Sequence, residues 1–291
     1  MGIDGGGSKC QACIADVKGV VLGEAVAGPA NPLHGMEQTL KSIEQAASLA
    51  MLNTGCQDLS LRQLVAGVGL AGVNLPGLFQ AINAWPHPFA ALHLTTDLHI
   101  ACLGAHQRPD GAVIVAGTGS CGYVGVPGRE CVLGGHGFPL GDKGSGAWMG
   151  LEAVKAVLLA SDGLGPATQL EALLTAELKA SGLMMVERLS GAKSSDYARL
   201  APLVLRAAGA GDRVAEGIVR EGADYLSALG QKLLAHHPSR ISMIGGLAEP
   251  LHPWLAPQLL DQLSAPLGPP EAGALLYARR HQQTAPAAEI E

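Results

Sequence analysis

The sequence has few aromatic residues, few charges and no long apolar run. Tryptophan, tyrosine and phenylalanine make up 3% of the 291 residues, so the core has to be built from aliphatic side chains. Hydrophobic residues make up 48% and charged residues 15%, which indicates a folded chain with a large core. No run of about 18 apolar residues occurs, and no basic leader precedes an apolar segment. We therefore predict neither a transmembrane helix nor a signal peptide, and we expect a cytoplasmic location.

Positive charge and metal-binding motifs are scarce as well. The formal net charge is −6 and no basic run occurs, which argues against nucleic acid and an anionic membrane surface as partners. Cys10 and Cys13 form a C-x-x-C pair, but the other four cysteines offer no second pair at zinc-ligand spacing. We interpret the cysteines as reduced, small apolar residues. The histidines form no H-E-x-x-H or similar motif.

Glycine, in contrast, is abundant at 40 residues, and it punctuates alternating strand and helix patterns. Such alternation predicts an α/β fold. In the first third we predict strands at 13–16, 20–26, 61–72 and 92–97, and helices at 35–52, 77–84 and 98–107. The apolar stripe of the first of these helices includes Leu40, Ile43, Ala47 and Leu49 to Met51.

The pattern restarts after Pro109–Asp110–Gly111. Residues 111–135 form strand, glycine turn, strand, turn and strand, as at the N-terminus, which indicates a duplicated lobe. We predict an N-terminal lobe of residues 1–108 and a C-terminal lobe of residues 109–291, with a small-ligand cleft between them. The C-terminal lobe is predicted to hold helices at 145–159, 168–181, 195–210, 213–236 and 250–263, and a strand at 240–244.

Two glycine loops follow apolar strands and are candidates for phosphate binding. The first comprises Asp4, Gly5, Gly6, Gly7, Ser8 and Lys9, and the second comprises Gly117, Thr118, Gly119 and Ser120. Glycines let backbone N–H groups approach phosphate oxygens, and a carboxylate such as Asp4 can hold Mg²⁺ directly or through water. A hairpin turn alone would also explain either loop. Gly245 and Gly246, at another strand end, would leave room for a flat base, or they form a simple strand-to-helix turn.

Several polar residues are candidates for binding or deprotonating a substrate. Asp97 ends an apolar strand, where a carboxylate can act as the general base for a sugar hydroxyl. Asp142, among glycines, can bind a sugar hydroxyl. Either aspartate could instead cap the helix that follows it. Asn31 could bind a sugar or shape a turn, and His136 stands out among the histidines for its glycine neighbours.

Six segments together resemble the actin and hexokinase superfamily, and within it the BadF/BadG/BcrA/BcrD-type ATPase and N-acetylglucosamine kinase family. The bacterial glucosamine kinases of that family are the most similar members. The segments occur in the family's order and span nearly the whole chain: GIDGGGSK (2–9), TTDLHIACLGA (95–105), AGTGSCG (116–122), FPLGDKGSGAWMGL (138–151), GGLAE (245–249) and PPEAGAL (269–275). The sequence differs from the family's usual residues at two positions. Ser8 replaces a usual Thr, and Lys143 replaces a frequent Glu.

The resemblance implies two actin-like (ribonuclease H-like) lobes, and a last helix near 271–283 that packs back on the N-terminal lobe. It implies an ATP:hexosamine phosphotransferase with Mg²⁺ and an amino-sugar substrate, and a homodimer is compatible with it. Asp97 would be the base for the 6-hydroxyl, and Asp4 would organise Mg²⁺. Sugar contacts would come from Asn31, Gly135, His136 and Asp142. ATP contacts would come from Gly6, Gly7, Ser8, Lys9, Gly117, Thr118, Gly119, Ser120, Gly245 and Gly246.

Four functions stay open at this point. Glucosamine kinase is the first, and N-acetylglucosamine kinase has the same chemistry on the acetylated sugar. A third is the ATPase activator of a dehydratase, which needs cysteines for an iron–sulfur cluster that the spacing here does not offer. The fourth is a non-catalytic sugar-sensing regulator, and we expect no added helix-turn-helix of the kind that such repressors carry.

Overall fold

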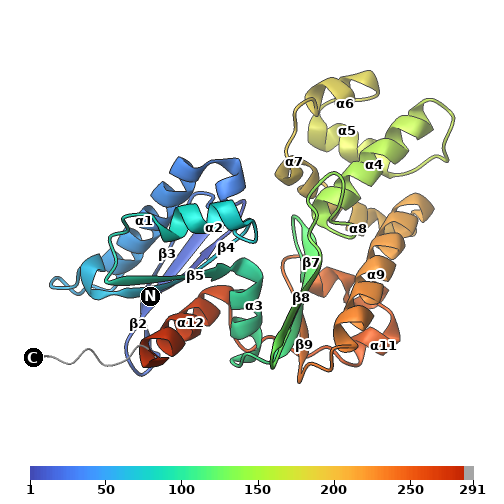
Figure 1. Ribbon diagram of the computed structural model, residues 1–291. Helices are drawn as coiled ribbons and strands as arrows, with labels where there is room; N and C mark the ends of the chain where they lie inside the picture. The colour runs from blue at the N-terminus through green and yellow to red at the C-terminus, as the bar shows by residue number, and fades with distance from the viewer. Residues whose placement is uncertain (285–291) are drawn as a thin grey trace, which may run out of the picture. The chain divides into compact units, whose positions relative to one another are not determined.

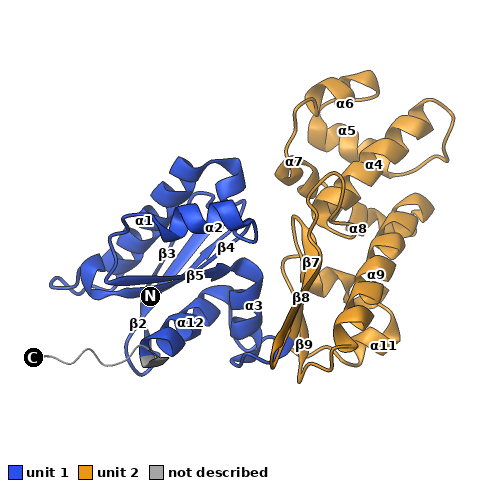
Figure 2. Cartoon of the chain, in the orientation of Figure 1, with its two compact units in different colours: residues 1–111, 266–291 blue, residues 112–265 orange. Residues whose placement is uncertain are grey.

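The structure is a computed structural model that describes residues 1–284. The chain divides into two units, one of residues 1–111 together with those from 266 onwards, the other of residues 112–265 (Figure 2). Each unit contains one mixed β-sheet with helices packed against it. The expected α/β class is confirmed. The lobe limits expected from the sequence, 1–108 and 109–291, stay a prediction.

The first unit is built on a five-stranded sheet in the order β3-β2-β1-β4-β5. Strands β1, β2 and β3 form an antiparallel meander, and β4 and β5 run parallel to β1. The strands are β1 (Gly2–Gly5), β2 (Cys10–Ala15), β3 (Val21–Ala27), β4 (Val65–Leu70) and β5 (Ala91–Thr96). The helices are η1 (Pro32–His34), α1 (Met36–Asn53), η2 (Leu61–Gln63), α2 (Pro76–Asn83), α3 (Asp97–His106) and α12 (Pro270–Thr284).

One face of this sheet is aliphatic and packs against α1. Ile3, Ile14 and Val68 are fully or almost fully buried there, together with Ile43 and Ala47 of α1. The predicted helical stripe is thus confirmed at these two positions. It is also confirmed at Ala50, which is fully buried, but it is wrong at Leu49, which is 37% exposed.

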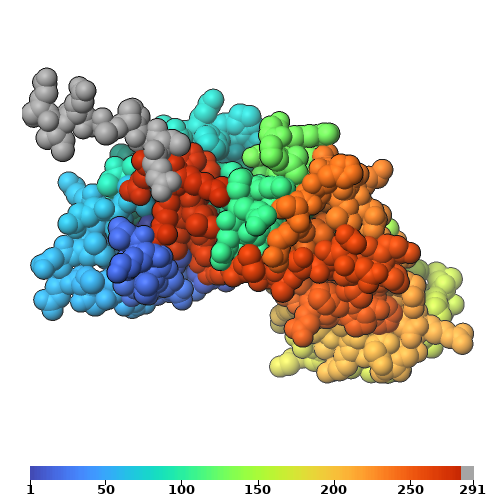
Figure 3. Space-filling view, turned by 90° about the horizontal axis from the view of Figure 1, so that it is seen from below, coloured from blue at the N-terminus to red at the C-terminus, as the bar shows by residue number. Residues whose placement is uncertain are grey.

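The opposite face carries glycines and packs against α12 and α3 (Figure 1). A Cβ atom at Gly2 would overlap the carbonyl oxygen of Glu271, and one at Gly67 would overlap that of Ala274. Gly273 of α12 touches the backbone of α3 at Ile100 in the same way. Seen from below, α12 and α3 lie side by side (Figure 3). The absence of side chains at these points lets the C-terminal helix lie directly on the N-terminal sheet.

The second unit repeats this arrangement on a four-stranded sheet in the order β8-β7-β6-β9. Here β7 and β8 are antiparallel and β9 is parallel to β6, as β4 is to β1. The strands are β6 (Gly111–Ala116), β7 (Ser120–Val126), β8 (Arg129–Gly134) and β9 (Ile241–Ile244). The helices are α4 (Gly146–Ser161), α5 (Leu170–Leu178), α6 (Leu183–Arg188), α7 (Ser194–Ala198), α8 (Ala201–Gly209), α9 (Arg213–Leu234), α10 (Ala248–Leu251), η3 (His252–Trp254) and α11 (Pro257–Leu260).

Prolines account for most of the differences from the predicted elements. The predicted helix at 250–263 is wrong, because Pro253 and Pro257 break it into α10, η3 and α11. The predicted helix at 195–210 divides into α7 and α8, and Pro202 lies in the first turn of the second piece. Helix α6 was not predicted, and strand β4 starts at Val65 because residues 61–63 form a 3-10 turn.

Three of the six cysteines are buried, as expected for reduced, small apolar residues. All six are free, and Cys10, Cys13 and Cys102 are buried. Burial raises the pKa of the Cys10 and Cys13 thiols to about 12, so both stay protonated at neutral pH. The interpretation is wrong for Cys56, which is exposed. Within residues 1–284, none of the helices combines the length and the apolar character needed to cross a membrane.

The contact between α12 and the sheet predicts a specific glycine requirement. Gly67→Ala should lower the free energy of unfolding by about 1–3 kcal/mol, because its Cβ overlaps helix backbone that cannot rotate away. Gly77→Ala in α2 is the matched control. No atom lies within 4 Å of a Cβ there, so it should be neutral or stabilising by up to about 1 kcal/mol. Urea unfolding measures both, and equal effects would contradict the packing argument.

Asp212 makes the stability of the second unit depend on pH. Its side chain accepts hydrogen bonds from Ala215 N (2.9 Å), which caps α9, from Gln169 N (2.6 Å) and from Thr168 Oγ1 (3.0 Å). Burial by itself would raise the pKa of this carboxyl, but the hydrogen bonds favour the charged form and lower it below the ordinary value. The carboxylate therefore stabilises the fold above the unfolded-state pKa, and this contribution is lost as the pH falls through the lower folded-state pKa.

Asp212→Ala should accordingly lower the free energy of unfolding by about 1–2 kcal/mol at pH 7. The difference from wild type should begin to shrink near about pH 4, where Asp212 of the unfolded chain becomes protonated, and should shrink further as the pH falls through the lower folded-state pKa. Asp224→Asn, at an exposed position of the same helix, should stay within about 0.5 kcal/mol of wild type. A difference that does not change between pH 7 and pH 3 would show that the charge of Asp212 is irrelevant.

Candidate functional site

The first glycine loop is a tight hairpin between β1 and β2. Gly6 N donates a hydrogen bond to Lys9 O (2.9 Å), and Ala30 N donates one to Gly6 O (2.8 Å). Gly7, Ser8 and Lys9 are exposed at its tip. The hairpin interpretation and the phosphate interpretation are compatible, because a turn with a hydroxyl and an ammonium group at its exposed tip is suited to anion binding.

The carboxyl ends of the parallel strands β1, β4 and β5 bring Asp4 and Asp97 to the same edge of the first sheet. Asp4 lies near the end of β1, and Asp97 follows β5 as the first residue of α3. Thr96 is the residue that caps α3, since its side chain accepts from His99 N (3.2 Å). Asp97 Oδ1 accepts from Leu98 N (2.9 Å). Capping α3 therefore does not explain an aspartate at position 97.

The two carboxyl groups are half-buried and close enough to repel each other. The pKa of Asp4 is raised to about 7, mainly by burial and also by the charges of Asp97 and Glu271, while the charge of Lys9 lowers it. Burial also raises the pKa of Asp97, against the hydrogen bond from Leu98 N. A cation or a proton brought to this edge would relieve the repulsion.

Asn31 shapes the loop that follows β3. Its Oδ1 accepts from Leu33 N (3.0 Å) and caps the short helix η1. The same atom lies 2.7 Å from where a Cβ at Gly72 would be, so Gly72 leaves the space that this side chain occupies. The turn-forming role of Asn31 is thus visible, and its sugar contact stays a prediction.

The second glycine loop meets the N-terminus of α4. Gly146 N and Ala147 N donate to the carbonyl oxygens of Gly117 (2.8 Å) and Thr118 (3.2 Å). Ser120 Oγ donates to Lys143 O (2.8 Å). These bonds fix the loop of residues 117–120 against the segment that precedes α4.

That segment carries Asp142, which lies beside the second glycine loop. A Cβ at Gly119 would be 2.6 Å from Asp142 Oδ2. Gly137 N donates to Asp142 Oδ1 (3.1 Å), and Gly135 N donates to Ser120 O (3.2 Å). Burial raises the pKa of Asp142, while Gly137 N and the charge of His136 oppose this.

The alternative role of Asp142 as a helix cap is wrong. Ser145 caps α4, because its Oγ accepts from Trp148 N (3.1 Å). Asp142 instead has a left-handed backbone with a φ of 60°, which is uncommon outside glycine and Asn or Asp. The structure thus brings four of the predicted residues together: Gly119, Ser120, Gly135 and Asp142.

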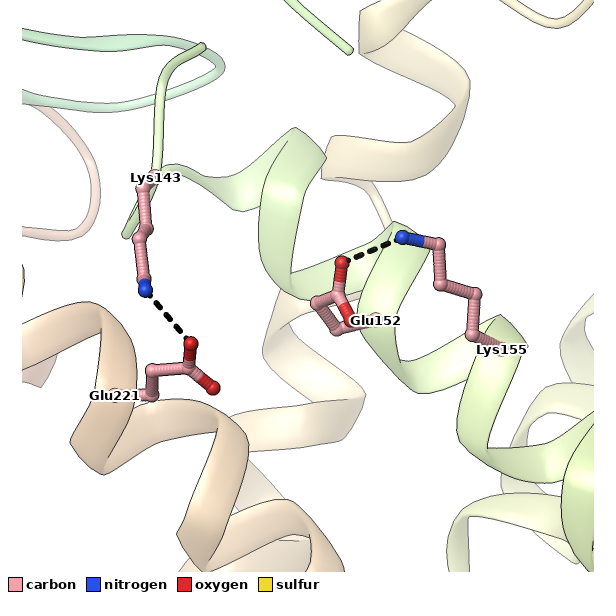
Figure 4. Close-up of polar contacts among 4 residues, drawn as sticks. All are labelled: Lys143, Glu152, Lys155 and Glu221. Atoms are coloured by element: carbon pink, nitrogen blue, oxygen red, sulfur yellow. Dashed lines mark hydrogen bonds and ion pairs between the residues drawn. The ribbon is translucent and has the colours of Figure 1, made fainter. Parts of the chain in front are cut away.

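Lys143, the departure next to Asp142, has its own partners. Its Nζ lies 2.7 Å from Glu221 Oε1 of α9 and 5.8 Å from the centre of the Trp148 ring (Figure 4). The figure also shows an ordinary ion pair within α4, between Lys155 and Glu152 (2.8 Å). The charge of Lys143 is therefore paired with Glu221.

Gly245 and Gly246 lie at the same end of the second sheet as the loop 117–120. Leu247 N donates to the carbonyl oxygen of Ala116, the residue before Gly117 (3.0 Å). Gly245 has a φ of 101°, and a Cβ there would overlap Ala116 O, so only glycine fits this turn. A Cβ at Gly246 would have no atom within 4 Å, and that exposed backbone is open to a ligand.

Three residues near these loops were not singled out in the sequence. Tyr225 lies near Gly134 and Asp142, and its pKa is raised by burial and by the charges of Asp142 and Cys121. Gln11 and Glu271 are linked beside Asp4. Tyr225 and Gln11 give no local signal, and Glu271 was noted only within the closing-helix segment. Over residues 1–284, no group of three His, Cys, Asp or Glu side chains is placed to hold a metal ion.

The two-lobed α/β fold is that of actin-like ATPases and sugar kinases. A ROK family glucokinase from Streptomyces griseus, solved with glucose and AMPPNP, has a TM-score of 0.54 and 19% identity over 97% of this chain and 98% of that one. At this identity the likeness shows the fold alone. The expected pair of actin-like lobes is confirmed.

Residues 1–278 match the BadF/BadG/BcrA/BcrD ATPase family, and the chain belongs to it. Glucosamine kinase GspK of Vibrio cholerae is 35% identical over 280 residues, which cover 96% of this chain and 95% of that protein. A candidate N-acetylglucosamine kinase from Chromobacterium violaceum has a solved structure with a TM-score of 0.90 and 30% identity, over 95% of this chain and 97% of that one. The resemblance noted in the sequence is confirmed.

Proposed function

We propose that this protein is an ATP-dependent kinase that transfers the γ-phosphoryl group of ATP to the 6-hydroxyl of glucosamine. The observation that carries the proposal is the position of Asp97. Its half-buried carboxyl lies at the carboxyl end of β5, and Thr96 rather than Asp97 caps α3. The full-length similarity to a protein named glucosamine kinase supports the choice of substrate.

The chemistry assigns each cluster a role. Phosphoryl transfer needs in-line positioning and charge stabilisation more than covalent catalysis. As the sugar O6 attacks the γ-phosphorus, its proton passes to Asp97. The bond from phosphorus to the β,γ-bridging oxygen breaks, and ADP leaves with that electron pair. Burial raises the pKa of Asp97, so its carboxylate is a stronger base than that of an exposed aspartate.

The substrates are Mg·ATP and the amino sugar. Asp4 would orient the Mg²⁺ that arrives with ATP, which is compatible with its half-buried carboxyl and the neighbouring charge of Asp97. Phosphate contacts would come from Gly6, Gly7, Ser8, Lys9, Gly117, Thr118, Gly119 and Ser120, and the adenine side from Gly245 and Gly246. Sugar contacts would come from Asn31, Gly135, His136 and Asp142. The cytoplasmic location and the homodimer stay predictions.

N-acetylglucosamine kinase is the second candidate. The observation in its favour is the likeness to the Chromobacterium violaceum protein, a candidate enzyme of that type. The pairing of Lys143 with Glu221, in contrast, is compatible with glucosamine as the substrate. A lysine whose charge is paired repels the ammonium group of glucosamine less than an unpaired lysine would.

Asp97→Asn tests the assignment of the base. The amide cannot accept the hydroxyl proton, so we expect kcat to fall by about 10²–10⁴-fold while the KM of each substrate changes little. Asp58→Asn, in an exposed turn, is the matched control and should retain wild-type kinetics. Turnover close to wild type in the Asp97 variant would remove this residue from the role of base.

A substrate panel tests the reaction itself. ADP release by purified protein with Mg·ATP should depend on an added sugar, and should be faster with glucosamine than with N-acetylglucosamine, glucose or no sugar. The reverse preference between the two amino sugars would establish the second candidate. Release that is independent of sugar would favour the dehydratase activator, in which case the protein should contain iron. Sugar binding without any release would favour the non-catalytic regulator.

A further inference from the structure

A chain of three polar side chains joins the first glycine loop to the C-terminal helix. Lys9 Nζ donates a hydrogen bond to Gln11 Oε1 (2.7 Å), and Gln11 Nε2 donates one to Glu271 Oε1 (2.7 Å). Gln11 lies directly opposite Asp4 in the pairing of β2 with β1, so both side chains lie on the face that α12 covers. We call this set the Lys9–Gln11–Glu271 chain.

Glu271 is the fixed end of this chain. It lies in the first turn of α12 and is 5% exposed. Its backbone is held by the sheet, because Cys13 Sγ donates to Glu271 O (3.5 Å) and Gly2 allows the same carbonyl to approach β1. The carboxylate is therefore placed by packing, and a buried carboxylate needs hydrogen bonds and a nearby positive charge.

Gln11 is the residue type that this geometry requires. Its amide accepts from an ammonium group through oxygen and donates to a carboxylate through nitrogen at the same time. A glutamate at this position could accept from Lys9, but it would face Glu271 with a like charge. A hydrocarbon side chain could do neither.

Lys9 is the exposed end. A free lysine side chain loses about 2 kcal/mol of conformational entropy when it is fixed in one geometry. A lysine that is already ordered needs less of this cost when it meets a phosphate. An ammonium group has three N–H donors, so those not engaged by Gln11 remain for a ligand.

We propose that Gln11 and Glu271 are positioning residues, which hold the ammonium of Lys9 in place to bind the phosphates of ATP. The inference rests on the proposed function for the role of Lys9. It extends the nucleotide site to α12, whose Glu271 lies 260 residues from Gln11 in the sequence. The competing explanation is that the link between Gln11 and Glu271 only fastens α12 to the sheet.

Gln11→Met is the first variant, because methionine has a similar length but cannot make either hydrogen bond. We expect the KM for Mg·ATP to rise about tenfold, as loss of one charge-assisted hydrogen bond predicts, with the KM for the sugar unchanged. Glu271→Gln should retain most of the ATP affinity, because its amide oxygen still accepts from Gln11. Gln57→Met, in an exposed turn, is the control and should behave as wild type.

A double-mutant cycle separates the two explanations. If Gln11 acts through Lys9, the variant with both Lys9→Met and Gln11→Met should bind Mg·ATP no more weakly than Lys9→Met alone. Two results would overturn the proposal. The two substitutions could weaken Mg·ATP binding independently, so that their fold-changes multiply, or Gln11→Met could lower the Tm and leave ATP affinity unchanged. Either result would mean that the link between Gln11 and Glu271 only fastens α12 to the sheet.

Direct calorimetric binding of Mg·ATP to the same variants keeps this test independent of the kinase reaction. If the wild type binds Mg·ATP but phosphorylates none of the sugars, the proposed function fails while the cycle still decides the role of Gln11. A wild type that does not bind Mg·ATP at all would overturn both.

Discussion

The arrangement depends above all on the direct contact between the backbone of α12 and the glycine face of the first sheet. Gly2 and Gly67 remove the side chains that would hold the helix away, and Gly273 brings it equally close to α3. This proximity places the first turn of α12, with Glu271, beside Asp4 and Gln11. The first turn of α12 thereby becomes part of the edge where the first glycine loop and Asp97 lie. The packing of α12 thus also sets the charge around Asp4.

A cluster of carboxyl groups, one buried and two half-buried, is the second consequence of this packing. Asp4, Asp97 and Glu271 are brought together with few cations nearby, and burial raises the pKa of the two aspartates. A fold that needed only stability would not collect like charges in this way, since hydrophobic residues of similar volume would serve as well. Perturbed carboxyl groups at the carboxyl ends of parallel strands are typical of sites that bind cations or transfer protons.

The second unit repeats the strand order of the first and uses its glycine loop differently. Its loop of residues 117–120 is anchored to the N-terminus of α4 and to the segment that carries Asp142. Gly245 brings the turn after β9 against the same loop. The repeated topology thus supports two unlike surroundings, one rich in carboxyl groups and one formed largely by backbone.

Local pattern along the chain was enough to predict the α/β class, the repeated strand–glycine turn–strand units, and the positions of Asp4 and Asp97 at strand ends. Features that depend on distant partners became visible only in the folded structure. It showed that Thr96 and Ser145, rather than Asp97 and Asp142, cap their helices, and that Lys143 pairs with Glu221. It also joined Gln11 to Glu271 across 260 residues. Periodicity and glycine spacing describe neighbours along the chain, whereas hydrogen-bond partners and burial are set by how distant segments pack, which no local pattern records.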